Sequence, residues 1–174
     1  MKAHPSAHRG FSLMELMFAI AVLAIVLGIG APSFARMARE NRVTTLTNDF
    51  VTSFALARSE SARRGMPVTI CASADGSSCS GGVDYATGWI LFTDDVGTAG
   101  QVDVGDEVLD AVPALPQTFT LAGSQPFVRF FPNGLTTPAG NKTFQLQNTQ
   151  NAELVRCMTL SGIGRTSTVK AVCP

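Results

Sequence analysis

The hydrophobic pattern of this chain changes twice along its length. Residues 11–35 are predominantly apolar, with a single carboxylate, Glu15, near their start. Residues 36–64 instead place apolar side chains at spacings of three and four, the period of one helix face. These apolar positions are Val43, Leu46, Phe50 and Phe54. We therefore predict one continuous helix over residues 11–64, about 80 Å long at 1.5 Å per residue, whose second half packs against a sheet.

Beyond Gly65, which is expected to end the helix, the pattern changes to short runs rich in β-branched and aromatic residues. Gly, Pro and Asn turns separate these runs. The expected strands are residues 67–72, 88–93, 107–109, 119–121, 127–131, 142–146, 154–160 and 168–171. One long helix followed by many short antiparallel strands predicts an α+β fold, with the helix packed on a carboxy-terminal antiparallel β-sheet domain over residues 65–174.

The apolar segment has the roughly 20 residues that a helix needs to span a bilayer. A carboxylate inside a membrane costs about 3 kcal/mol and is usually paired, so Glu15 requires a partner. A cut after Gly10 would create a positively charged amino terminus at Phe11, four residues from Glu15.

Two alternatives for the apolar segment remain. A secretory signal peptide has an apolar region of 7–15 residues and a small-residue cleavage site, and the only candidate here, residues 29–31, is followed directly by Pro32. An ordinary membrane anchor is the second alternative, and it leaves Glu15 unexplained.

The charges are balanced overall, with 13 basic and 13 acidic residues, but they are unevenly distributed. Residues 71–110 contain eight acidic and no basic residues. Six of the acids crowd a Gly-rich connection: Asp94, Asp95, Asp103, Asp106, Glu107 and Asp110. Calcium prefers such oxygen ligands, but their spacing does not match an EF-hand loop. We expect a flexible, solvated loop and no metal or cofactor.

The four cysteines show no CxxC pair and no nearby histidine, which disfavours a zinc site. Disulfides in an oxidising compartment such as the periplasm fit better. Of the three possible connectivities we favour Cys71 with Cys79 and Cys157 with Cys173, because each closes a local loop. Such a bond contributes about 2–4 kcal/mol, and it places this domain outside the cytoplasm.

Both histidines of the chain, His4 and His8, lie in residues 1–10. Cleavage after Gly10 would remove them. The mature chain would then have no Ser-His-Asp, Cys-His or His-containing metal motif, so we predict a non-enzymatic protein.

The segment Arg9-Gly10-Phe11-Ser12-Leu13-Met14-Glu15-Leu16 resembles the processing site of type IV prepilins and type II secretion pseudopilins. This resemblance implies that prepilin peptidase cuts after Gly10 and methylates Phe11. It also implies that Glu15 pairs with the amino terminus of a neighbouring subunit during filament assembly.

Further segments extend the resemblance over nearly the whole chain. They are residues 57–62, 68–71, 88–94, 131–134 and 160–165, and they are similar to the GspH/FimT family of minor pilins and pseudopilins. That family implies a type IV pilin-like fold: a leader (1–10), a transmembrane and assembly helix (11–35), an amphipathic half-helix (36–64) and a periplasmic β-rich domain (65–174).

The same resemblance implies a single-pass inner-membrane protein that later joins a pilus or pseudopilus. Its partners would be prepilin peptidase and other major and minor pilins or pseudopilins. We predict a FimT/FimU-like minor pilin of a type IV pilus, with a GspH-type minor pseudopilin of type II secretion as the alternative.

Some proteins resembling this one take up DNA through a carboxy-terminal Gly-Arg-x-Arg motif. Gly164 and Arg165 match its first half, whereas Ser167 stands where the second arginine would be. The candidate contacts to double-stranded DNA are Arg165, Lys170, Arg156, Arg129 and Lys142, because basic side chains carry nonspecific phosphate affinity. The alternative is that these are ordinary surface charges on strands.

Overall fold

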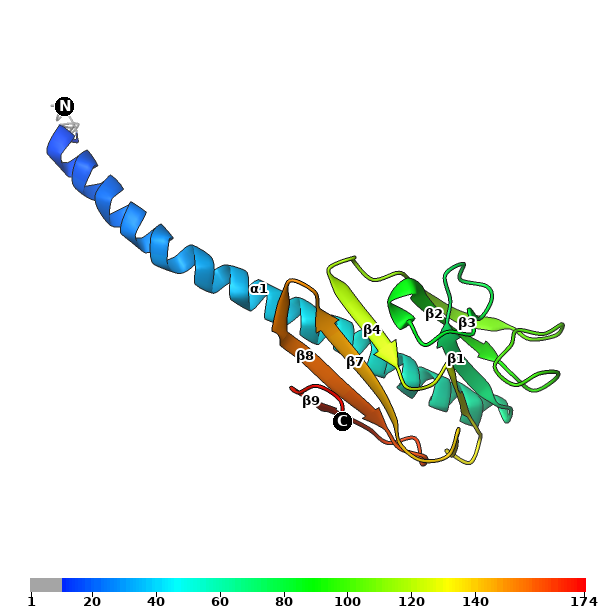
Figure 1. Ribbon diagram of the computed structural model, residues 1–174. Coiled ribbons are helices and arrows are strands. Elements are labelled where there is room, and N and C mark those ends of the chain that lie inside the picture. The colour runs from blue at the N-terminus through cyan, green and yellow to red at the C-terminus, as the bar shows by residue number, and fades with distance from the viewer. Residues whose placement is uncertain (1–10) are drawn as a thin grey trace, which may run out of the picture. The chain divides into compact units, whose positions relative to one another are not determined.

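The computed structural model describes residues 11–174, and for residues 29–32 it describes the backbone alone. The chain divides into two compact units, Met1–Glu40 and Asn41–Pro174. Helix α1 (Leu13–Arg64) begins in the first unit and ends in the second (Figure 1). The predicted long helix is therefore confirmed, and its assignment continues without a break through Pro32.

Two antiparallel sheets make up the rest of the second unit. The five-stranded sheet has the order β3 (Val108–Pro113), β2 (Gly88–Thr93), β1 (Val68–Ala72), β5 (Phe127–Phe130) and β6 (Thr136–Thr137). The four-stranded sheet has the order β4 (Phe119–Gly123), β7 (Lys142–Asn148), β8 (Asn151–Leu160) and β9 (Thr166–Val169). A short 3₁₀ helix, η1 (Tyr85–Thr87), precedes β2. Each of the eight expected strands has a counterpart, and β6 is an additional one.

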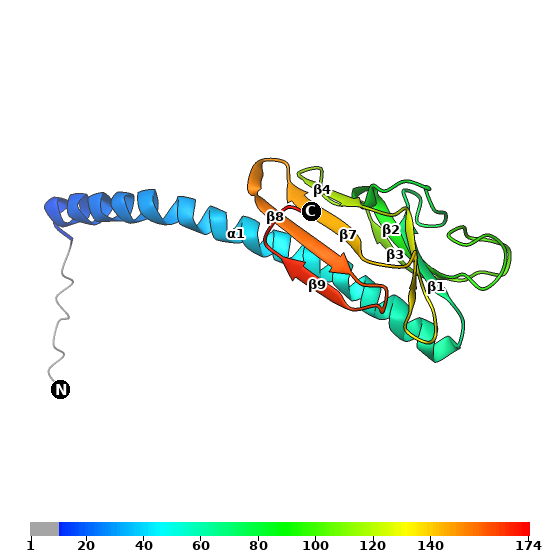
Figure 2. The same ribbon diagram turned by 60° about the horizontal axis from the view of Figure 1, so that its bottom comes forward.

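Both sheets pack against the helix residues that belong to the second unit (Figure 2). The four predicted apolar positions of the helix are buried, and Phe50 lies at the centre of an aromatic cluster. The ring centroid of Phe50 lies 4.7 to 5.4 Å from those of Phe54, Tyr85, Trp89 and Phe144. These rings come from the helix, from η1 and from both sheets, so one core joins all three layers.

Strands β1 and β2 are buried on both faces. One face belongs to the helix-side core through residues such as Ile70 and Leu91. The opposite face forms a smaller cluster of Cys71, Ile90 and Phe92, which Cys79, Val102 and Phe127 help to cover. Loops therefore cover the outer face of this sheet, which explains why these strands are continuously apolar rather than alternating.

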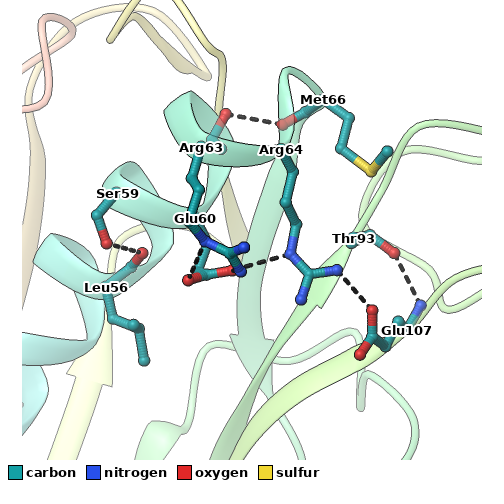
Figure 3. Close-up of polar contacts among 9 residues, drawn as sticks. Leu56, Ser59, Glu60, Arg63, Arg64, Met66, Thr93 and Glu107 are labelled. Carbon is teal, nitrogen blue, oxygen red and sulfur yellow. Dashed lines mark hydrogen bonds and ion pairs between the residues drawn. The ribbon is translucent and has the colours of Figure 1, made fainter.

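The carboxy-terminal end of α1 is fixed by a cap and by a charge network. Gly65 has a φ of 70° and donates its N–H to the carbonyl of Ser61 at 3.0 Å, as expected for a glycine cap. Glu60 accepts hydrogen bonds from Arg63 and Arg64, and Arg64 also reaches Glu107 on the segment before β3 (Figure 3). These hydrogen bonds lower the pKa of Glu60 to about 2.

Candidate functional site

The expected processing site lies at the start of the described chain. Gly10 and the leader residues 1–10 lie outside the described residues. Ser12 caps the helix: its hydroxyl and its carbonyl both accept from the N–H of Glu15, at 3.2 and 3.1 Å, as an N-cap serine does. Phe11 lies just before this cap and is 77% exposed, so the position that the resemblance marks for methylation is accessible.

Glu15 is exposed on the first turn of α1, and within residues 11–174 its carboxylate makes no ion pair. Its neighbours on the helix are apolar: Met14, Met17, Phe18 and Ala21 line a shallow hydrophobic surface. A carboxylate in such surroundings gains a partner only from another chain or from residues outside the described range. The prediction that Glu15 pairs with a neighbouring amino terminus therefore stays a prediction.

The first part of α1 is long and apolar enough to cross a membrane. Its most apolar 18-residue window has a mean hydropathy of 2.5, and none of that window is buried within the chain. Residues 13–35 would span about 34 Å as a helix, which matches a hydrocarbon core of about 30 Å. This surface is stable in water only if lipid or other helices cover it.

Two disulfides form with the expected connectivity. Cys71 pairs with Cys79 across 8 residues, and Cys157 pairs with Cys173 across 16 residues. The first holds a loop over the outer face of β1, and the second fixes the carboxy-terminal tail to β8. The backbone N–H of Cys173 also donates to the Gln145 side chain at 3.0 Å, so the tail crosses from β8 to β7.

The five basic residues predicted to contact DNA differ in their solvent exposure. Arg165 and Lys170 are exposed. Lys142 is 1% exposed, and its ammonium group donates to the Thr136 hydroxyl at 2.6 Å and to the Gly140 carbonyl at 3.0 Å. Burial lowers the pKa of Lys142. Arg156 is 6% exposed. We therefore correct the expectation for Lys142 and Arg156: strand alternation turns both toward the helix-side core.

The guanidinium of Arg129 also has partners within the domain. It is half-buried on β5, its Nη2 donates to the backbone carbonyl of Asp94, and its Nε lies 3.5 Å from the Asp94 carboxylate. Its guanidinium stands 5.6 Å from the centre of the Phe131 ring, within cation–π range. Asp94 compensates much of the charge of Arg129, and the expected contact of Arg129 with DNA stays a prediction.

Two carboxylates of the acidic connection are held by hydrogen bonds from backbone N–H groups of the same loop and from Thr69. Asp94 is fully buried, and its Oδ2 accepts from the Thr69 hydroxyl at 2.6 Å and from the Gly100 N–H at 3.0 Å. Asp103 similarly accepts from the N–H of Thr98 at 2.6 Å. The expectation of a solvated loop is wrong for Asp94. In the described part of the chain, no group of three or more His, Cys, Asp or Glu side chains could hold a metal ion.

Sequence reasoning missed Arg58. This exposed residue of α1 donates from Nη1 to the carbonyl of Gly164 at 3.1 Å, directly before Arg165. The contact joins residues 106 positions apart, and no local sequence pattern predicts it. The structure thus places a second arginine at the turn that carries Arg165.

Comparison with known proteins gives two family matches. Residues 46–164 match the family described as type II transport protein GspH, and residues 5–31 match the prokaryotic N-terminal methylation motif. A search of the curated proteins finds no match.

Two crystal structures of the type IV minor pilin FimU from Pseudomonas aeruginosa (strain PAO1) have a similar fold, each at 19% sequence identity. One superposes with a TM-score of 0.56, covering 72% of this chain and 91% of FimU. The other superposes with a TM-score of 0.59, covering 75% and 90%. The type IV pilin-like fold predicted from the sequence is confirmed.

Proposed function

The chain belongs to the family described as type II transport protein GspH and has the fold of a minor pilin, and from this premise we propose that it is a non-enzymatic minor pilin of a type IV pilus. Pilins are structural subunits, and membership of this family implies assembly with other pilins and processing by prepilin peptidase. In this proposal the peptidase cuts after Gly10 and methylates Phe11, and Glu15 pairs with the amino terminus of a neighbouring subunit.

One observation carries the proposal: a methylation motif over residues 5–31 continues, through helix α1, into a pilin-like domain. The apolar first part of α1 is unburied within the chain. In the membrane, lipid covers it. In a filament, helices of neighbouring subunits replace the lipid, and close packing between helices then drives association because lipid tails are as apolar as the side chains.

We propose a single-pass orientation in the inner membrane, with residues 65–174 in the periplasm. The two disulfides support this side, because such bonds persist in oxidising compartments and are rare in the cytosol.

The first experiment is the intact mass of the protein extracted from membranes. We expect the mass of residues 11–174 plus one methyl group, less four hydrogens for two disulfides. The same chain expressed without prepilin peptidase is the control and should retain residues 1–10. An unprocessed chain in the presence of the peptidase, or a cut near Ala31, would contradict the proposal.

A GspH-type pseudopilin of type II secretion is the second candidate, favoured by the description of the matching family. The pilus function and the secretion function are distinguished by deleting the gene and measuring surface pili and secreted extracellular enzymes in the same cultures. Loss of pili with normal secretion supports the pilus subunit, and the reverse result supports the pseudopilin. Complementation with the intact gene is the control.

Contact with double-stranded DNA is a candidate activity of the pilus subunit, supported by the exposure of Arg165 and Lys170. Phosphate contacts make binding steeply salt-dependent. We expect retention on DNA at low salt that weakens as salt rises and falls in Arg165→Ala. Absence of retention at low salt would contradict this activity.

A further inference from the structure

Strand β9 forms a free edge of the four-stranded sheet. In the described part of the chain it pairs with β8 alone, and it lies at the margin of the sheet (Figure 2). The chain after β9 does not return along this edge, because Cys173 is bonded to Cys157 on β8 and donates its N–H to Gln145 on β7. The outer edge of β9 is therefore left open by residues 11–174.

The hydrogen bonds of the β8–β9 hairpin show which backbone groups face this edge. The N–H of Ser161 donates to the carbonyl of Arg165 at 2.9 Å, so these two residues form a hydrogen-bonded pair. Such pairs alternate with non-hydrogen-bonded pairs along an antiparallel ladder, so the pairs that Thr166 and Thr168 make with β8 are of the second kind. The N–H and C=O groups of Thr166 and Thr168 therefore point away from β8, toward the free edge.

This edge lacks the features that normally stop a strand from pairing with another chain, which are proline, charged residues, bulges or a covering segment. Thr166–Val169 contains no proline and no charged residue, and its pairing with β8 shows no register shift. The edge strand β3 differs, because it ends in Pro113 and its pairing with β2 is irregular. The edge strand β4 is partly covered by a bridge to Asp84. Strand β9 is thus open to the addition of another strand.

The side chains of β9 are accessible as well. Ser167, Thr168 and Val169 are all exposed. Thr168 lies opposite Met158, which is fully buried, so the core of the domain ends at β8 and does not reach β9. A strand added at this edge would find both faces of β9 free.

Two cations flank the edge and determine what can pair with it. Arg165 and Lys170 are exposed, and among residues 11–174 neither side chain makes an ion pair. They are separated by about 17 Å along an extended strand. Two copies of the chain pairing antiparallel through Thr166 and Thr168 would place each Lys170 one position from Arg165 of the other copy. Like charges oppose that pairing, whereas opposite charges across strands stabilise it.

We propose that β9 is a docking edge that accepts, in antiparallel orientation, an extended segment with a carboxylate at each end, from a different subunit of the same filament. The assignment to a filament subunit rests on the function proposed above, whereas the open edge does not. Backbone hydrogen bonds to Thr166 and Thr168 supply the affinity, and the flanking cations Arg165 and Lys170 select the sequence. The added strand extends the four-stranded sheet and joins the domains of two subunits.

The first test measures peptide binding to the processed full-length chain in nanodiscs of zwitterionic lipid, by fluorescence anisotropy. The probe is the labelled, end-blocked peptide Glu-Val-Thr-Val-Thr-Glu, whose third and fifth residues would lie opposite Thr168 and Thr166. N-methylation of those two peptide residues removes the N–H groups that face β9 and should weaken binding about tenfold or more. N-methylation of the second and fourth residues, whose N–H groups face solvent, is the matched control and should retain binding.

Variants of the chain test the same edge. Thr168→Pro removes an outward N–H and leaves the ladder to β8 intact, because proline is tolerated on an edge strand where its nitrogen faces solvent. It should weaken binding about tenfold, whereas Thr168→Ala keeps the N–H and should bind as the parent does. The double variant Arg165→Glu, Lys170→Glu should instead prefer the peptide Lys-Val-Thr-Val-Thr-Lys, which the parent should bind more weakly than the acidic one.

Equal binding of the two methylated peptides, equal binding of the acidic and basic peptides, or no binding of the acidic peptide would each overturn the docking edge. The methylated peptides decide this even if Thr168→Pro fails to fold. Self-association of the parent chain that Thr168→Pro abolishes would overturn the choice of a different subunit and would indicate a second copy.

A second test places the edge in the filament. Thr168→Pro should be cut after Gly10 as the parent is, but it should enter sheared filaments at a level reduced about tenfold, whereas Thr168→Ala should enter at the parental level. Parental incorporation of Thr168→Pro, together with loss of peptide binding, would retain the edge and overturn its assignment to a filament subunit. Failure of the pilin proposal has a different readout, because it appears as an uncut chain in the intact mass of the parent.

Discussion

Glu60 shows how a single residue makes the stability of the domain depend on pH. Hydrogen bonds from Arg63 and then Arg64 lower the pKa of Glu60 in the folded chain from its ordinary 4.5 to about 2. The ionised form is therefore favoured by folding. This contribution is fully present above pH 4.5, and it is lost as the pH falls from 4.5 through about 2.

We expect Glu60→Gln to flatten the dependence of the unfolding midpoint on pH between 4.5 and about 2, because the glutamine has no proton to bind. Denaturant titrations of the parent and of Glu60→Gln across this pH range measure the two unfolding midpoints. Glu153→Gln is the control, since Glu153 is exposed and its side chain makes no ion pair among residues 11–174. Parallel pH curves for Glu60→Gln and the parent would contradict the prediction.

At this scale, sequence reasoning succeeded where the information was local. The disulfide partners lie close in sequence, so loop closure alone selects the observed pairs. The burial of Lys142 and Arg156 could also be predicted from the sequence, because residues two apart on a strand share one face. Lys142 shares its face with Phe144 and Leu146. Arg156 shares its face with Leu154 and Met158. Counting their charges without this alternation led to the wrong surface. Arg58 differs, because a contact between residues 106 positions apart has no local signature.

At the scale of elements, periodicity located the helix face and eight strands but not the arrangement of the strands. The two-residue strand β6 is too short to show a period. The order β3-β2-β1-β5-β6 beside β4-β7-β8-β9 depends on which strands bury their apolar faces against α1. That choice is made by packing in three dimensions, so a one-dimensional pattern does not contain it.

The carboxy-terminal tail depends on a covalent bond more than on its own packing. Lys170, Ala171 and Val172 are exposed, and the tail is held by the Cys157–Cys173 bond and one hydrogen bond from Cys173. A loop of this length contributes about 3 kcal/mol through the entropy of the unfolded chain. We expect the double variant Cys157→Ala, Cys173→Ala to lose about that free energy of unfolding, as measured by denaturant titration.

The same variant should also become sensitive to limited proteolysis after β9, because the tail loses its anchor. The matched comparison is Cys71→Ala, Cys79→Ala, which should be destabilised while its tail stays protected. If both variants were cut equally at the tail, the disulfide would not be what holds it.

At the scale of the whole molecule, the two units differ in where their stability comes from. The unit Asn41–Pro174 buries its apolar side chains within itself. The apolar window of α1 buries none of its own, so its stability depends on lipid or on other subunits. A change in the first part of the helix should therefore alter assembly and leave the folding of the second unit unchanged.

Glu15 gives the sharpest case of this separation. If Glu15 pairs with the amino terminus of a neighbouring subunit inside the filament, its removal leaves a buried ammonium group without compensation, at a cost of about 3 kcal/mol or more. We expect Glu15→Leu to insert into the membrane and to be cut after Gly10, but to enter sheared filaments at a level reduced by about a hundredfold.

Quantitative immunoblots of membrane and filament fractions measure the partition of this variant. Met14→Leu is the matched control, because it changes an adjacent exposed side chain of the same helix with little change in volume. Glu15→Asp keeps the charge but shortens its reach, so an intermediate level in filaments is expected. Incorporation of Glu15→Leu at the parental level would show that helix packing alone sets assembly and that the carboxylate has another role.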